Sequence, residues 1–189
     1  SVEFAAARFG TRLVVVLGHS KCGAIEATLD ELTRPVENQS RNLQAIVDQA
    51  LDRARAGADA SGVPLASGDI PPTLLLRCDR RQVVSAVTNL VDNAVTYNRA
   101  GGHVAVVLDR GRGTYGVSVT DDGPGVPAEF LEKIFEPFYR LPGRAEWQGG
   151  TGLGLTLVRS IARHHGGDVR CESLPGGGAC FVVELPLKA

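Results

Sequence analysis

Apolar residues recur with two different periods along this chain, and these periods predict its helices and strands. Apolar side chains spaced by three and four residues predict amphipathic helices at residues 41–56, 80–97 and 153–165, with a shorter helix at 128–134. β-branched runs and alternating patterns predict strands at residues 73–78, 104–109, 115–120, 168–173 and 180–187, and a short one at 63–65. The pattern indicates an α+β fold: a two-layer α/β sandwich, in which helices cover one face of a mixed sheet of about five strands.

The first 48 residues follow another pattern, which predicts a helix-strand-helix fragment before the sandwich. Its strand, Leu13–Leu17, is a continuous apolar run of the kind found in strands buried on both faces. Such a strand needs neighbours, so we expect this fragment to dock on an edge of the main sheet or to be poorly ordered. We therefore divide the chain into an incomplete fragment, 1–48, and a complete domain, 49–189.

Composition narrows the class of protein without identifying its chemistry. The formal net charge is −1, so no bulk field attracts nucleic acid or an anionic membrane. No apolar run approaches the roughly 20 residues that span a bilayer, and the start lacks a leader pattern. Four scattered cysteines favour a reducing, cytoplasmic setting. Because the chain begins with Ser1 and contains no methionine, we expect it to be a piece of a longer protein.

Candidate chemistry lies in four short motifs that follow one another through the last hundred residues. They are NLVDNAVTYN (89–98), DDGPGVP (121–127), FEPFYR (135–140) and GGTGLGL (149–155). In the first, Asn89 and Asn93 share one face of a helix. Amides buried without polar partners cost roughly 1–3 kcal/mol each. A hydrated magnesium ion carrying phosphates would supply such partners.

The second and fourth motifs bring glycines to places where backbone meets a ligand. Gly123 and Gly125 would let the chain approach a flat ligand, although Asp-Asp-Gly alone also fits a simple tight turn. The glycines of residues 150–155 precede a helix, whose first N–H groups bind phosphate readily. Their spacing is neither that of a Walker loop nor that of a dinucleotide fingerprint.

Together, in this order, the four motifs resemble the N box, first glycine box, F box and second glycine box of the histidine-kinase ATP-binding domain. The resemblance covers about residues 39–189, and the superfamily also holds gyrase, Hsp90 and MutL-type ATPases. It implies ATP and Mg²⁺ as cofactors, with Asn93 as the magnesium ligand, Asn89 near the phosphates and Asp121 accepting a hydrogen bond from the adenine amino group. The other ATP-binding positions that it implies are Tyr97, Gly123, Gly125, Phe135, Phe138, Arg140, Gly150, Thr151, Gly152, Leu153, Gly154 and Leu155.

The sequence departs from this family in ways that bear on activity. Hydrolysing members have a Glu four residues before the magnesium Asn as general base, but an amide at Asn89 cannot take a proton. The site therefore looks built for phosphoryl transfer rather than hydrolysis. Family members often have Lys at the position of Thr96, where it contacts phosphate, and Thr at that of Ala179.

The phosphoacceptor histidine of the family is missing. None of the four histidines, at 19, 103, 164 and 165, lies in the H-E-L-R-T-P-like context. Autophosphorylation by this chain alone is therefore not expected. The resemblance implies a phosphoacceptor histidine domain and a response regulator as partners, in the cytoplasm or in the cytoplasmic part of a membrane-bound sensor. A non-catalytic nucleotide-binding regulatory module remains the alternative.

Residues 1–48 resemble a fragment of β-carbonic anhydrase. In GHSKCGA, His19 and Cys22 match two of the three protein zinc ligands of that family. The third ligand, a Cys that lies upstream in a C-x-D-x-R segment, has no counterpart here. We expect at most an incomplete zinc site and no carbonic anhydrase activity. A natural fusion, a mis-assembled reading frame and a deliberate chimera would all explain the junction.

Overall fold

The computed structural model describes residues 39–68, 75–110, 113–142 and 151–186, all within the second of the chain's two units, Val36–Ala189. Residues 1–38 of the fragment predicted at 1–48, with His19 and Cys22 among them, lie outside the described residues. The boundary predicted at 48/49 falls within helix α4, Leu43–Ser61, which belongs wholly to this second unit.

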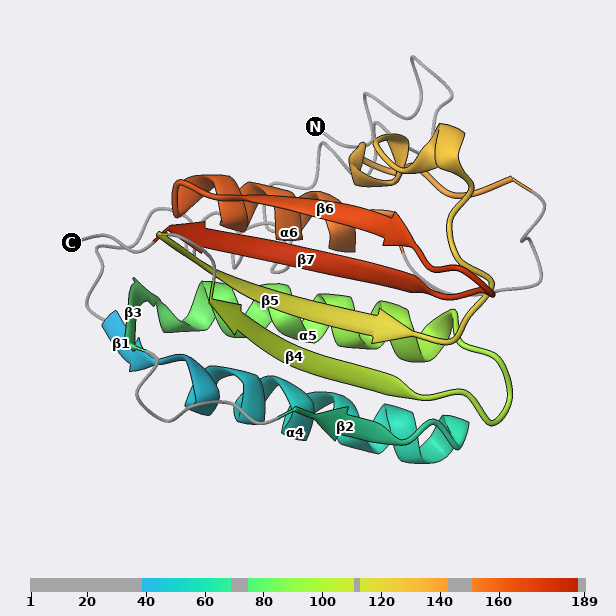
Figure 1. Ribbon diagram of the computed structural model, residues 1–189, viewed down its shortest axis with the longest axis horizontal. Helices are drawn as coiled ribbons and strands as arrows, with labels where there is room; N and C mark the ends of the chain where they lie inside the picture. Colours follow the sequence, from blue (N-terminus) through green and yellow to red (C-terminus); the bar gives the residue numbers. More distant parts are fainter. Residues whose placement is uncertain (1–38, 69–74, 111–112, 143–150, 187–189) are drawn as a thin grey trace, which may run out of the picture. The chain divides into compact units, whose positions relative to one another are not determined.

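A five-stranded mixed sheet forms one layer of the described domain (Figure 1). The strand order is β2-β4-β5-β7-β6, where β2 runs parallel to β4 and the other neighbours are antiparallel. The strands span Leu65–Ser67 (β2), Val104–Arg110 (β4), Thr114–Asp121 (β5), Asp168–Ser173 (β6) and Ala179–Pro186 (β7). The predicted mixed sheet of five strands is confirmed.

Three helices lie side by side on one face of this sheet (Figure 1). They are α4, α5 (Arg80–Thr96) and α6 (Gly154–His164). The two-layer α+β sandwich predicted from the sequence is therefore confirmed. Helix α4 runs past its predicted end at residue 56, because Ala54 and Ala58 are both buried and extend its apolar face.

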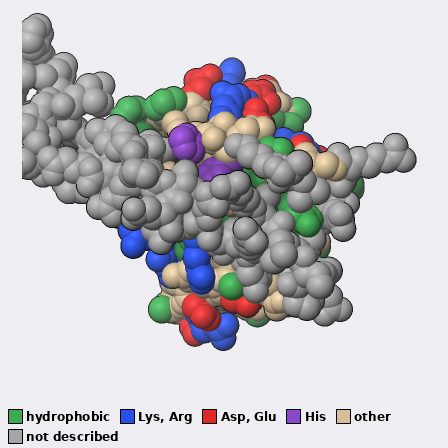
Figure 2. Space-filling view, turned by 90° about the vertical axis from the view of Figure 1, so that its left-hand side faces the viewer, with side chains coloured by type: hydrophobic (Ala, Val, Ile, Leu, Met, Phe, Trp, Pro, Cys, Tyr) green, Lys and Arg blue, Asp and Glu red, His purple; other side chains and the backbone are tan. Residues whose placement is uncertain are grey.

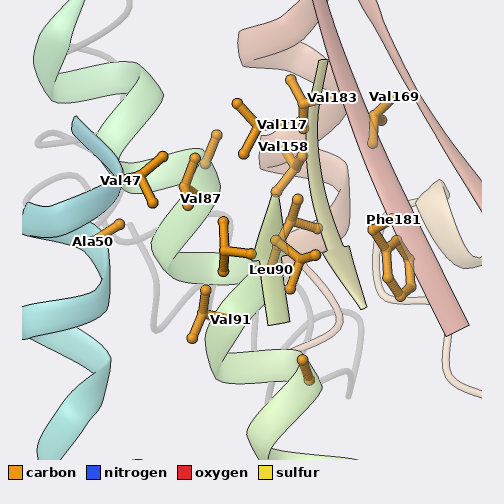
Figure 3. Close-up of a cluster of buried hydrophobic side chains, with 14 of the residues drawn as sticks. Val47, Ala50, Val87, Leu90, Val91, Val117, Val158, Val169, Phe181 and Val183 are labelled. Atoms are coloured by element: carbon orange, nitrogen blue, oxygen red, sulfur yellow. The ribbon is translucent and has the colours of Figure 1, made fainter. Parts of the chain in front are cut away.

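The hydrophobic core fills the space between the two layers (Figure 3). Val47 of α4 and Val87 of α5 meet between the helices, and Leu90, which is fully buried, lies toward the sheet. Val117 of β5 and Val183 of β7 form part of the opposite wall. In both strands alternate residues are buried, as expected when one face of a sheet packs on helices.

The strand predicted at residues 73–78 does not belong to the main sheet, and this prediction was wrong about its place. It forms β3 (Leu75–Asp79), which pairs with β1 (Gln39–Asn42) in a separate antiparallel ribbon at the end of the helix layer (Figure 1). The reason is local: Asp79 is both the last residue of β3 and the N-cap of α5, so the strand leads directly into the helix layer. Strand β1 was not predicted at all.

A single helix predicted at 128–134 is likewise replaced by two short 3-10 turns, Ala128–Phe130 and Lys133–Phe135. Neither turn has a side-chain cap, and each is only three residues long. Helices this short gain too few hydrogen bonds to extend. Their role is to turn the chain toward the segment that precedes α6.

A histidine joins the end of α6 to the start of α5, at one end of the helix layer. His165 follows α6, and its Nε2 accepts the backbone N–H of Asp79 at 3.1 Å, while its Nδ1 lies 2.8 Å from the carbonyl oxygen of Ile161. Both contacts are satisfied by the neutral ring with its proton on Nδ1. Figure 2 looks at this end of the domain and shows histidine side chains together among basic and acidic groups.

We expect His165→Ala to lower the free energy of unfolding by about 1–3 kcal/mol, because the Asp79 N–H at the start of α5 loses its acceptor. Urea denaturation followed by circular dichroism measures this change. His164→Ala is the matched control, since His164 is exposed and should shift stability by less than about 0.5 kcal/mol. Equal effects of the two substitutions would contradict a specific role for His165.

Candidate nucleotide site

A cavity of about 250 Å³ opens where the carboxyl end of β5 meets α5 and the start of α6. Its walls come from five parts of the chain that are far apart in sequence: α5, the segment after β5, the 3-10 turns with the residues that follow them, the first turn of α6, and the start of β7. Parts of all four sequence motifs therefore meet at one place.

Most of the predicted site residues line this cavity. They are Asn89, Asn93, Tyr97, Asp121, Gly125, Arg140, Thr151, Gly152, Gly154 and Leu155. Four others do not contribute to its wall: Gly123, Phe135, Phe138 and Leu153. Gly150 lies outside the described residues.

The two asparagines of α5 face the beginning of α6. Asn89 donates from Nδ2 to the carbonyl oxygen of Ser85 at 2.9 Å. A Cβ added at Gly154 would lie 3.1 Å from Asn89 Oδ1 and 3.9 Å from Asn93 Nδ2. Because residue 154 is a glycine, the start of α6 can lie close to the two amides. The side-chain oxygen Oδ1 of Asn89 faces Gly154.

Asp121 lies at the other end of the cavity and is 6% exposed. Its Oδ1 accepts two backbone N–H groups, from Gly123 at 2.8 Å and from Ala179 at 3.2 Å. These two donors fix the plane of the carboxylate. The neighbouring thiol of Cys171 is kept neutral, because burial and then the charge of Asp121 raise its pKa to about 12.

The next carboxylate, Asp122, is in a different environment. Its side chain is 40% exposed, and hydrogen bonds from His103, first from its backbone N–H and then from its ring, hold the Asp122 pKa below its usual range. It does not line the cavity. Of the Asp-Asp pair, the buried Asp121 is therefore the one that can meet a ligand.

The F-box aromatics play structural parts that the sequence did not reveal. Phe135 is buried and packs edge-on against Phe181 with ring centroids 6.4 Å apart. Phe138 is 49% exposed, and its backbone N–H donates to the carbonyl oxygen of Gly152 at 3.0 Å. This bond ties the end of the F box to the second glycine box.

The apolar part of the cavity wall was not predicted from the sequence motifs. It consists of Pro124, Val126, Ile134, Tyr139, Leu141 and Phe181, together with Ala179, which was noted only as a departure from the family pattern. The alternation in β7 could have indicated Phe181, whereas Val126 and Ile134 carry no polar signature. An apolar wall with a few convergent polar groups is typical of small-molecule sites.

The donor set suits a phosphate-bound magnesium ion better than a metal held by protein alone. Within the described ranges, no three His, Cys, Asp or Glu side chains are grouped so that they could hold a metal ion. Magnesium in nucleotide sites commonly takes one or two protein oxygens and completes its shell with phosphates and water. Asn89 Oδ1, which faces Gly154, is an oxygen of this kind.

Two curated relatives are sensor kinases of bacteria. The sensor-like histidine kinase SenX3 of Mycobacterium tuberculosis is 33% identical over 180 residues, which covers 91% of this chain and 43% of that protein. The histidine protein kinase DivJ of Caulobacter vibrioides is 38% identical over 164 residues, covering 86% of this chain and 27% of that protein. The chain thus spans less than half the length of these relatives.

Solved structures of similar fold are histidine kinase domains. The mycobacterial sensor histidine kinase MprB matches with a TM-score of 0.69 and 27% identity, over 79% of this chain and 97% of that one. The catalytic domain of histidine kinase ThkA matches with a TM-score of 0.68 and 27% identity, over 77% of this chain and 93% of that one.

Two family models match the sequence. The carbonic anhydrase model matches residues 1–108. The described residues of this range, from residue 39 onward, belong to the same unit as the rest of the described domain. In the described part of the chain, no helix is long and apolar enough to cross a membrane. The second model covers residues 78–189, which hold all four motifs and the cavity. The chain therefore belongs to the histidine kinase-, DNA gyrase B- and HSP90-like ATPase family.

Proposed function

We propose that this domain binds Mg-ATP in the cavity and donates the γ-phosphoryl group to a histidine on a separate phosphoacceptor domain, as part of two-component signalling. One observation carries the proposal: the Asn89–Asn93 pair and the first turn of α6 meet at one end of a cavity whose other end holds the buried Asp121. A nucleotide likewise carries its phosphates at one end and its base at the other, which is the arrangement that these lining residues would serve.

At the base end, the Asp121 carboxylate would accept the adenine amino group, while the apolar wall packs on the flat ring. Guanine carries an oxygen at that position, so a buried acceptor would face an acceptor and lose its hydrogen bond. At the phosphate end, the N–H groups at the start of α6 would hold phosphate oxygens, aided by the helix dipole. Asn93, with Asn89 beside it, would hold magnesium, which neutralises charge on the phosphates.

The residues present favour transfer over hydrolysis. Asn89 occupies the position at which hydrolysing members of the superfamily have a Glu, and an amide cannot serve as general base for water. Thr96 is exposed on α5 and does not line the cavity, so it adds no cation to the phosphate end. We therefore infer a slow ATPase and a site that waits for an external acceptor.

The acceptor and the downstream partner come from other polypeptide segments. Histidine kinase ThkA, a protein of this fold, has been solved in complex with the response regulator protein TrrA. By analogy we propose a phosphoacceptor histidine hairpin and a response regulator as partners, and a cytoplasmic location in which this segment contacts neither nucleic acid nor membrane. Zinc binding by His19 and Cys22 stays a prediction for the segment outside the described residues.

Calorimetry with Mg-ATP, Mg-ADP and Mg-GTP tests the nucleotide site. We expect ATP and ADP to bind with micromolar to sub-millimolar Kd and GTP to bind at least about 100-fold more weakly, because the adenine contact is lost. Equal binding of GTP would exclude Asp121 as the reader of the base. No binding of any nucleotide would exclude the proposed site.

Phosphoryl transfer separates a kinase from a regulatory module. With [γ-³²P]ATP and a supplied histidine hairpin from a related sensor kinase, we expect label on the hairpin and none on this chain alone. Nucleotide binding without transfer to any hairpin tried would favour the regulatory alternative.

A further inference from the structure

The hairpin that joins β6 to β7 closes against the segment that follows Asp121. Its last strand pair is Ser173 opposite Ala179, and its turn is held by two backbone hydrogen bonds, Leu174 N–H to Gly178 O at 3.0 Å and Gly177 N–H to Leu174 O at 3.1 Å. The hairpin end is thus a defined structure and can position what it contacts.

Three contacts attach this hairpin end to the segment 121–126. Ala179 donates its N–H to Asp121 Oδ1 at the start of the segment. Gly178 lies so close to the segment that a Cβ added to it would collide with the carbonyl oxygen of Asp121. In turn, a Cβ added at Gly125 would lie 2.8 Å from the carbonyl oxygen of Gly178. These contacts leave no room for a side chain at either glycine.

The third contact is made by a side chain. Ser173 Oγ accepts the backbone N–H of Val126 at 3.2 Å and donates its own proton to the carbonyl oxygen of the same residue. One hydroxyl therefore satisfies both backbone groups of Val126, which uses its donor and an acceptor lone pair. Val126 lines the cavity, whereas Ser173 does not.

We propose that Ser173 is a positioning residue for the base-binding end of the cavity. It holds Val126 from one side of the hairpin while Ala179 holds the Asp121 carboxylate from the other, so both ends of the segment keep a fixed distance from a bound base. This inference rests on the proposed function, because it assumes that Asp121 reads adenine. It assigns a role in specificity to a serine outside the cavity.

The test compares Ser173→Ala with Ser173→Thr, which keeps the hydroxyl and suits a strand. Binding of Mg-ATP and Mg-ITP is measured by competition calorimetry, since inosine carries an oxygen in place of the adenine amino group and gains nothing from Asp121. Ser118→Ala is the matched control, because Ser118 on β5 also donates to a backbone carbonyl, that of Val107 at 3.2 Å, and does not line the cavity.

We expect Ser173→Ala to raise the Kd of Mg-ATP about tenfold, to change that of Mg-ITP less than about threefold, and to be rescued by Ser173→Thr within about twofold. Ser118→Ala should leave both constants unchanged. An unchanged ATP Kd, or the same loss for ATP and ITP, overturns the positioning role alone. If the unsubstituted protein binds ATP no better than ITP, the base assignment of the proposed function fails, and this inference fails with it.

Discussion

Asp121→Asn should weaken Mg-ATP binding by about 100-fold or more, equivalent to about 2.7 kcal/mol, while the fold stays intact. The geometry around this carboxylate explains the size of the effect. Two backbone N–H groups, those of Gly123 and Ala179, already point at Oδ1. An asparagine at 121 keeps these two hydrogen bonds only if its side-chain oxygen takes the position of Oδ1. Its NH₂ group then points toward the ligand. A donor would then face the adenine amino group, which is also a donor.

Calorimetry of the variant with Mg-ATP and Mg-ITP checks this expectation, with circular dichroism as evidence of folding. The inosine oxygen can accept from the new NH₂ group, so the preference for ATP over ITP should shrink or reverse. Asp122→Asn is the matched control, because Asp122 is the neighbouring carboxylate and does not line the cavity, so this variant should bind ATP normally. Normal ATP binding by Asp121→Asn would show that the base lies elsewhere.

Asn93→Ala should remove most of the magnesium dependence of ATP binding. In the unsubstituted protein we expect ATP to bind more tightly with Mg²⁺ than with EDTA, because an amide oxygen holds the hydrated ion on the phosphates. In the variant this difference should collapse, and transfer to a supplied histidine hairpin should fall about 100-fold, since charge on the transferring group is no longer compensated in place. Alanine has the highest helix propensity, so α5 itself should be unharmed.

Calorimetry in Mg²⁺ and in EDTA, followed by the transfer assay, separates the two effects. Asp92→Asn provides the comparison, because Asp92 is the adjacent residue of α5, is exposed and does not line the cavity. If Asn93→Ala retains the full magnesium effect, the ion is held by other groups of the cavity. In that case Asn89, whose Oδ1 faces Gly154, becomes the first residue to substitute.

The sequence predicted those parts of the fold in which pattern and local chemistry agree. Strand β6 has its predicted bounds because its alternation is clear, and α5 begins as predicted, where Asp79 caps it with hydrogen bonds to Arg81 and Gln82. Strand β1 could not be predicted, because Gln-Ser-Arg-Asn has no apolar alternation and becomes a strand only by pairing with β3. The extension of α4 through Gly57 depends on burial of Ala58, which is a tertiary effect.

In the candidate site, the polar residues could be predicted from the sequence motifs, whereas the apolar residues of the cavity wall are visible only in the structure. Asn93 and Asp121 are recognisable because buried amides and carboxylates need partners. Val126 and Ile134 are ordinary core residues by sequence and become cavity wall only through the path of the chain after β5. Phe135 is the opposite case: it belongs to a motif, but it is buried and does not line the cavity, so its role in ATP binding stays a prediction.

Four of the five strands of the sheet form two local hairpins, β4–β5 and β6–β7, which are joined along a single seam between β5 and β7. Each hairpin closes a short loop, whereas the seam joins residues as far apart in sequence as Thr114 and Pro186, and a longer loop costs the chain more entropy to close. Asp121 and Ala179, at the end of the cavity that we propose to bind the base, lie on that seam. A ligand bound at this place therefore stabilises the pairing of β5 with β7, which is the pairing of the sheet that costs the most entropy to form.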